Sequence, residues 1–315
     1  MPESAYEPTE IMGQQIFGLP VDRETLFSNH KKIYKKRVEK RQRKLIVKIP
    51  FIKPFLKKGE KILLITTGYS PLASIAQYLT AFVFIYLKRS LFVFTNYRII
   101  HVPTTPSYKY KGSIAQITYA GCQSISLKGG SLVVEYGKFG KVETFKGIPG
   151  SERKKIKELL KQFSISVTKN DLAERLYLCP RCGNRLTQGK FRCEACQLKF
   201  RGKLLARIVA IIFPGGGYFY ARQYLVGLLN AVLELFLLAY LAVTINDALK
   251  GVEESLYYVA ALSAIYLIIK IISVVHSTHF IGEFIPKDKK LKPIGSSAKK
   301  KKASQEPSTP TSSVA

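Results

Sequence analysis

The chain has 315 residues, which is enough for two or three domains. Lys and Arg outnumber Asp and Glu by 50 to 21, and the formal net charge is +29. Such an excess favours an anionic neighbour, but it is also typical of the cytoplasmic loops of membrane proteins. The first thirty residues are mildly acidic and contain no apolar stretch, so we expect no secretory signal there.

Residues 1–56 are predicted to form a flexible N-terminus that carries a basic helix. Residues 31–58 contain 13 Lys or Arg and one Glu. A narrow apolar stripe at helical spacing runs through Ile33, Tyr34, Val38 and Leu45. Three roles fit this pattern: a solvated helix near a membrane, a helix on anionic lipid, or a helix on nucleic acid. The candidate lipid contacts are Lys31, Lys32, Lys35, Lys36 and Arg37.

Residues 57–165 are predicted to form a domain of short strands. Runs rich in Val, Ile, Phe, Tyr and Thr alternate with Gly, Asn, Pro and Ser, which is typical of antiparallel strands and turns. An amphipathic helix follows, with Ile156, Leu159, Leu160 and Phe163 on one face. Residues 71–87 carry no charge, and we interpret them as a buried strand with an apolar lead-in rather than a membrane helix.

Two stretches of this domain carry a family resemblance. The run LFVFTNYRIIHV, with KKGEKILLI before it, resembles the signature of bacterial pleckstrin-homology-like (PH-like) domains. Phe94 stands where that family usually has Leu. The resemblance implies a PH-like antiparallel β-barrel with a C-terminal helix, and it leaves the ligand open.

Four of the five cysteines lie within residues 175–201. Cys179 and Cys182 form one CxxC pair, and Cys193 and Cys196 form the second. Two such pairs separated by a short hairpin predict a tetrahedral thiolate site for structural Zn²⁺, with no position left open for catalysis. Two disulfides are the alternative, which needs an oxidising compartment. The pattern resembles zinc ribbons.

Residues 203–280 are predicted to be a membrane segment. Residues 223–245 and 256–275 are apolar and long enough to span a bilayer. Lys and Arg flank the pair, whereas the loop between them is acidic, so both termini are expected in the cytoplasm. Residues 204–220 then form a re-entrant or interfacial segment. The run FPGGGYFYARQYLVGLL resembles the Pro-Gly entry of a small two-span module. We expect an integral protein of a bacterial cytoplasmic membrane.

Three polar residues fall inside these spans. If the two helices fold back on each other near residue 250, Glu234 lies about one turn from Lys270, with Asn230 beside Glu234. This register predicts an ion pair inside the membrane. The alternative is a neutral Glu234 and a Lys270 that extends to the interface.

The final segment, residues 281–315, has the composition of a disordered basic tail. Its lysines at Lys299, Lys300, Lys301 and Lys302 are further candidates for contact with anionic lipid.

No catalytic constellation appears in the sequence, so we expect a protein that is not an enzyme. The leading hypothesis is a non-enzymatic membrane-anchored adaptor or scaffold. Its cytoplasmic PH-like and zinc-ribbon modules would bind protein partners or anionic lipid, and the ribbon would be a rigid spacer between barrel and membrane. The alternatives are a membrane-tethered nucleic-acid-binding protein and an accessory subunit of a membrane transport or secretion assembly.

Overall fold

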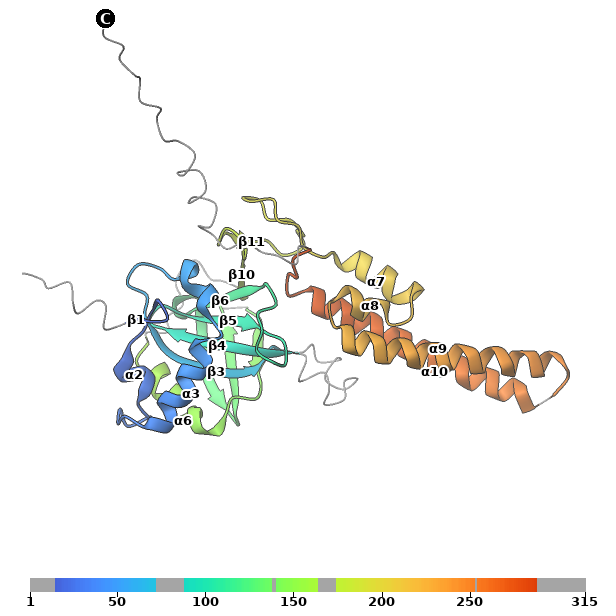
Figure 1. The fold of residues 1–315 in the computed structure, drawn as a ribbon, viewed down its shortest axis with the longest axis horizontal. Coiled ribbons are helices and arrows are strands. Elements are labelled where there is room, and N and C mark those ends of the chain that lie inside the picture. The colour runs from blue at the N-terminus through green and yellow to red at the C-terminus, as the bar shows by residue number, and fades with distance from the viewer. Residues whose placement is uncertain (1–14, 72–87, 138–139, 164–173, 253, 288–315) are drawn as a thin grey trace, which may run out of the picture.

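Two antiparallel sheets and an elongated set of apolar helices make up the described part of the chain (Figure 1). The structure is a computed structural model, and it describes residues 15–71, 88–137, 140–163, 174–252 and 254–287. The strand predicted within residues 71–87 and the lysines at 299–302 lie outside the described residues.

The larger sheet has six strands in the order β11-β10-β6-β5-β4-β3. Its strands are β3 (Ile62–Tyr69), β4 (Arg89–Thr95), β5 (Arg98–Pro103), β6 (Ile114–Thr118), β10 (Leu176–Leu178) and β11 (Arg185–Leu186). The central strands β4 and β5 are buried along nearly their whole length. This burial explains why apolar residues follow one another without alternation at Leu91–Phe94 and Ile99–Ile100, because both faces of the sheet are covered.

One face of this sheet is covered by the N-terminal residues. These form β1 (Gln15–Ile16), β2 (Leu19–Pro20), α2 (Arg23–Phe27), α3 (Lys36–Ile46) and the 3₁₀ turn η1 (Pro50–Phe55). Leu26, Ile46 and Ile52 are buried in the same apolar cluster as the sheet residues. The predicted limit at residue 56 therefore does not divide the fold, and residues 15–56 are a packed layer rather than a flexible lead-in.

The helix α3 is held by a polar contact as well as by packing. The Gln42 side chain donates to the backbone carbonyl of Ile65 and accepts from its N–H, both at 2.9 Å. This pairing satisfies backbone groups on edge strand β3. Leu45 of the predicted stripe is buried, whereas Ile33 and Tyr34 precede the helix and are more than half exposed.

The other face is covered by a second sheet and a helix. The second sheet is β7-β8-β9, with β7 (Cys122–Lys128), β8 (Ser131–Tyr136) and β9 (Val142–Phe145). Helix α6 (Gly150–Lys161) buries Ile156, Leu159 and Leu160 against it, as the apolar spacing predicted.

The prediction of a closed barrel is wrong. The described strands of this domain form two separate sheets that do not close into a barrel. After β6 the chain turns through the 3₁₀ turn η2 (Tyr119–Gly121) and enters the second sheet. The free edge of β6 then pairs with β10 of the cysteine-rich segment. A strand from outside the predicted domain thus occupies the edge that barrel closure would have needed.

The residues behind the PH-like resemblance meet at one buried ion pair. Arg98 lies 2.8 Å from Glu60, and Thr95 donates to the same carboxylate at 2.8 Å. Asn96 accepts from the Lys61 N–H at 2.8 Å. The signature therefore joins the hairpin β4–β5 to the start of β3.

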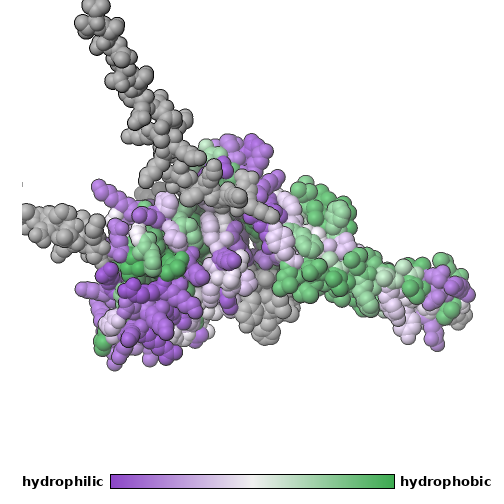
Figure 2. All heavy atoms as spheres, viewed as in Figure 1, coloured by the Kyte–Doolittle hydropathy of each residue, from purple (hydrophilic) through white to green (hydrophobic). Residues whose placement is uncertain are grey.

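The C-terminal helices form a unit that we call the apolar arm (residues 203–281). It contains α7 (Lys203–Ile212), α8 (Gly216–Tyr220), α9 (Tyr224–Leu249) and α10 (Glu254–Ile281). α9 and α10 pack as an antiparallel hairpin that extends away from the sheets, and hydrophobic residues dominate its surface between hydrophilic ends (Figures 1 and 2). Both helices are long and apolar enough to cross a membrane, and 11% of the most apolar window of each is buried.

Candidate metal centre and polar junctions

The four cysteines of the CxxC pairs form one cluster. Their sulfur atoms all lie within 4.8 Å of one another, and none is in a disulfide. Cys179 Sγ lies 3.4 Å from Cys196 Sγ, and Cys182 Sγ lies 3.5 Å from Cys193 Sγ. Four thiolates around a tetrahedral zinc at ~2.3 Å would be about 3.8 Å apart. The cluster is therefore a candidate metal site with a donor set that fits zinc.

The backbone around the cysteines has the geometry of two similar turns. Gly183 and Gln197, which directly follow the second cysteine of each pair, both have positive φ, at 74° and 57°. Burial raises the pKa of the Cys179 thiol, and the N–H groups of Arg181 and Cys182 oppose that rise because they donate to its sulfur. Amides directed at sulfur are suited to a bound thiolate.

The cysteine-rich segment, which we call the ribbon (residues 175–201), is joined to the large sheet. Its strand β10 pairs with β6 on one side and with β11 on the other. Tyr177 and Leu186 share an apolar cluster with Ala115 of β6 and with Cys179 and Cys193. The ribbon is thus an extension of the sheet rather than a separate domain on a linker.

The same ribbon also holds the chain where it leaves α10. Phe284 packs in the ribbon cluster, with its ring 5.0 Å from that of Tyr177. Phe200 and Pro286 form an antiparallel bridge, and the Arg201 N–H donates to Ile285 at 2.9 Å. Residues 281–287, predicted to begin a disordered tail, are therefore part of this junction.

Inside the apolar arm the structure brings Asn230, Glu234 and Lys270 together. Lys270 Nζ lies 2.8 Å from Glu234 Oε2, and Asn230 Nδ2 donates to Glu234 Oε1 at 2.5 Å. The Glu234 side chain is fully buried and that of Lys270 is 10% exposed. Each polar side chain removed from solvent here therefore has a partner.

Further partners of this pair come from the α7–α8 turn, which the sequence analysis did not connect to it. Lys270 donates to the carbonyls of Ala210 and Phe213 at the end of α7, at 3.2 and 3.5 Å. The Gly215 N–H donates to Glu234 at 3.3 Å. The cation therefore meets the carbonyl end of α7, where the helix dipole favours positive charge.

The predicted re-entrant segment turns back on itself. Gly215 has a positive φ of 64° at the turn between α7 and α8. The Gly202 N–H, before α7, donates to the Tyr220 hydroxyl at the end of α8 at 3.2 Å, and Arg201 donates to the Tyr220 carbonyl. The segment thus begins and ends at the same level of the arm.

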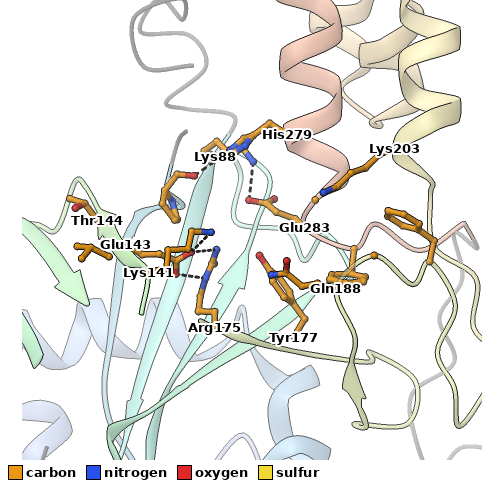
Figure 3. Close-up of a pocket in the computed structure, with 16 residues that line it drawn as sticks. Lys88, Lys141, Glu143, Thr144, Arg175, Tyr177, Gln188, Lys203, His279 and Glu283 are labelled. Atoms are coloured by element: carbon orange, nitrogen blue, oxygen red, sulfur yellow. Dashed lines mark hydrogen bonds and ion pairs between the residues drawn. The ribbon is translucent and has the colours of Figure 1, made fainter. Parts of the chain in front are cut away.

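A buried polar network at the base of the arm was not predicted from the sequence. Lys88, before β4, lies 3.0 Å from Glu283, and Arg175 lies 2.7 Å from Glu143 of β9. These side chains point into one cavity between sheet, ribbon and arm (Figure 3). Burial would raise the pKa of the Glu283 carboxyl, but the Lys88 and Lys111 ammonium groups lower it to about 2.

His101 belongs to the same network. Burial, with Arg175 adding to it, holds the pKa of His101 well below its ordinary 6.5, so the ring is neutral. Arg175 donates to Nδ1 at 2.8 Å, which leaves the proton on Nε2. That nitrogen lies 3.0 Å from the Ser70 hydroxyl and 3.1 Å from that of Ser90.

The basic residues before and within α3 lie apart from these junctions. Figure 1 places α3 on the side of the sheets away from the α9–α10 hairpin, and Figure 2 shows a hydrophilic surface there. The candidate lipid contacts on this segment are Lys31, Lys32, Lys35, Lys36 and Arg37. They are therefore not gathered at the base of the arm.

When the chain is compared with known proteins, no family model, no curated protein and no solved structure matches it. The resemblances to PH-like domains, zinc ribbons and a two-span module rest on the residues quoted for each. The architecture itself consists of antiparallel sheets, a four-cysteine cluster and a hairpin of two long apolar helices.

Proposed function

We propose that this chain is a non-enzymatic adaptor anchored in a membrane. The ribbon fixes its soluble part, a PH-like domain in two-sheet form, to the membrane anchor. The observation that carries this proposal is the double attachment of the ribbon: β10 extends the large sheet, while Phe200 and Arg201 pair with the chain that leaves α10. Such an arrangement sets the orientation of the sheets relative to the bilayer.

The apolar arm is the proposed anchor. α9 has 26 residues, about 39 Å at 1.5 Å per residue, and the hydrocarbon core of a bilayer is about 30 Å thick. Arg201, Lys203 and Arg222 gather at the base of the arm, whereas its far end carries Asp247 and Glu254. By the positive-inside rule the base, and with it the sheets and ribbon, faces the cytoplasm.

The proposed cofactor is one structural Zn²⁺ held by the four cysteines. All four ligands would be thiolates, so no coordination position is left for substrate. A ribbon of this size has a small apolar core, and zinc binding to such modules supplies on the order of 10 kcal/mol of folding free energy. The metal would thus stabilise the joint between sheet and anchor.

The basic surface of α3 is the proposed partner-binding face. Lys36, Arg37 and Lys40 lie on a helix that packs its other side on the sheet through Leu45 and Ile46. Because this surface is remote from the arm, its position favours an acidic cytoplasmic partner over lipid of the bilayer that holds the arm. Salt-dependent retention on DNA would point instead to nucleic acid.

The test is a combined metal and topology measurement on the full chain. We expect about one zinc per purified chain. A cysteine introduced at Lys250 should react from outside intact cells, and one introduced at Lys300 only after permeabilisation.

A paired variant isolates the role of the ribbon. Cys179→Ser with Cys196→Ser should abolish zinc binding and expose the ribbon to protease, whereas Cys122→Ala, outside the cluster, should retain the metal. If the double variant melts like the wild type and its ribbon stays protected from protease, the ribbon is not the joint.

A further inference from the structure

Two adjoining cavities lie where the sheets, the ribbon and the apolar arm meet. The first, which we call the polar cavity, has a volume of about 450 Å³. The second, the groove, has a volume of about 550 Å³ and runs between α7 and α10. Lys203, His279 and Gly282 line both, so the two cavities adjoin at these residues.

The polar cavity carries an excess of positive charge. Four cationic side chains line it, together with two carboxylates: Lys88, Lys141, Arg175, Lys203, Glu143 and Glu283. Each carboxylate already has a buried cation, because Lys88 pairs with Glu283 and Arg175 pairs with Glu143.

Two lysines at the cavity remain available for a ligand. The Lys141 side chain is 59% exposed and lies 3.7 Å from a carboxylate that Arg175 already neutralises. Lys203 is exposed, and no ion pair joins it to a carboxylate of the described residues. The cavity is therefore suited to an anion that accepts charge-assisted hydrogen bonds.

The groove has a different chemistry. Val274 and Val275 of α10 and Arg207 of α7 line it, and Leu204 of α7, which is 71% exposed, adds apolar surface to the same helix. The Thr278 hydroxyl is buried at this groove without a hydrogen-bond partner among the described residues. The two valines give the groove an apolar wall between α7 and α10, which is suited to a hydrocarbon chain.

We infer that the two cavities form a binding site for one anionic glycerophospholipid, with its phosphate in the polar cavity near Lys203 and Lys141 and an acyl chain in the groove between α7 and α10. The inference rests on the proposed membrane anchoring. Free phosphate shares the charge chemistry of the headgroup, but it leaves the apolar groove without an occupant. The site lies at the base of the arm, the level at which phospholipid headgroups meet the hydrocarbon core.

Such a lipid would form part of the joint between anchor and sheets. Its phosphate would contact Lys141, which precedes β9 of the second sheet, and Lys203, which begins α7. One bound molecule would therefore connect two elements that the ribbon also connects, and the headgroup composition of the membrane would affect the rigidity of the joint.

The experiment measures lipid retained by the full zinc-loaded chain in detergent, by native mass spectrometry. Phosphatidylglycerol is compared with zwitterionic phosphatidylcholine and with inorganic phosphate alone. We expect phosphatidylglycerol to bind at least tenfold more tightly than phosphatidylcholine. The double variant Lys141→Gln/Lys203→Gln should reduce that preference by about tenfold or more, since each lost charge-assisted contact weakens binding.

Two further variants test the contribution of the acyl chain and provide a control for the loss of a lysine. Val274→Trp fills the groove and should remove lipid while the polar cavity remains. Lys250→Gln, a lysine-to-glutamine change at the far end of the arm, should leave lipid binding unchanged. Equal retention of both lipids by the wild type, or unchanged retention by the double lysine variant, would overturn the inference.

Inorganic phosphate distinguishes a lipid site from a simple anion site. If phosphate competes fully with phosphatidylglycerol and Val274→Trp has no effect, the site takes a free anion and the lipid inference is wrong. Zinc content is measured on the same samples, and the accessibility of a cysteine at Lys250 is measured in intact cells that express the same chain. Correct topology without lipid selectivity would refute this inference alone, whereas wrong topology would refute the anchoring on which it rests.

Discussion

Replacement of Lys270 by methionine removes the cation that lies 2.8 Å from Glu234, in the middle of the apolar arm. The Glu234 carboxylate is fully buried, and breaking a buried ion pair from one side costs about 3–5 kcal/mol. The carbonyls of Ala210 and Phe213 also lose a donor, at about 1 kcal/mol each. These losses sum to about 5–7 kcal/mol, and at about 2–4 °C per kcal/mol we expect Lys270→Met to lower the Tm by roughly 10–30 °C.

The assay is thermal unfolding of the purified chain in detergent, with a double variant as the decisive comparison. Glu234→Gln/Lys270→Met removes both charges of this pair, and the glutamine can still bond to Asn230 and Gly215. We expect this double variant to recover at least half of the lost Tm. Lys250→Met, which removes an exposed cation at the far end of the arm, should melt like the wild type.

The result that would refute this reasoning is additivity. If Glu234→Gln and Lys270→Met each lower the Tm and the double variant loses the sum, the two side chains do not act as a pair. A Lys270→Met variant that melts like the wild type would show that the Glu234 carboxylate does not depend on Lys270 for its stability in the arm.

Three further predictions concern the close packing of the arm, the ribbon junction and the buried network. A Cβ at Gly217 would lie 2.7 Å from the Cβ of Ala210, so Gly217→Ala should cost about 1–3 kcal/mol in thermal unfolding, whereas Gly150→Ala, where a Cβ meets nothing within 4 Å, should cost little. Phe284→Ala should remove about 3–5 kcal/mol from the ribbon cluster, and amide hydrogen exchange at the contact between ribbon and C-terminal segment should accelerate; unchanged exchange would place the joint elsewhere. The folded pKa of Glu283, about 2, lies below its ordinary 4.5, so its carboxylate stabilises the fold above pH 4.5 and that contribution is lost as the pH falls toward 2. The difference in Tm between wild type and Glu283→Gln should therefore shrink between about pH 6 and about pH 3, and a difference that does not change with pH would contradict the pairing with Lys88.

The spacing of residues along the chain best predicted which side chains meet in the structure. The two CxxC pairs lie within one short segment, and the structure brings their sulfurs together. Helical register within one hairpin likewise placed Glu234 near Lys270, because the intervening turn is short and both helices are regular. In each case the partners are fixed by nearby chain geometry.

Contacts between residues far apart in the sequence could not be predicted from local spacing. Lys88 and Glu283 are 195 residues apart, and no periodic pattern links them. The closed barrel was wrong for a related reason, since its closure depended on which strand would take the edge of β6, and a ribbon strand takes it. The basic composition of residues 31–58 concealed the few buried positions, such as Gln42 and Ile46, that pack this segment on the sheet.

The bridge between Phe200 and Pro286 joins the chain segments that lie directly before and directly after the arm. Lys203, which begins the arm, and Gly282, which directly follows it, are neighbours in space. In terms of chain path, the whole arm is therefore an insertion in the part formed by the sheets and the ribbon, which continues on both sides of it. A short linker in place of residues 203–281 would keep Phe284 in the ribbon and close the chain without crossing any other element. We expect the sheets and the ribbon to fold as one protein without the arm.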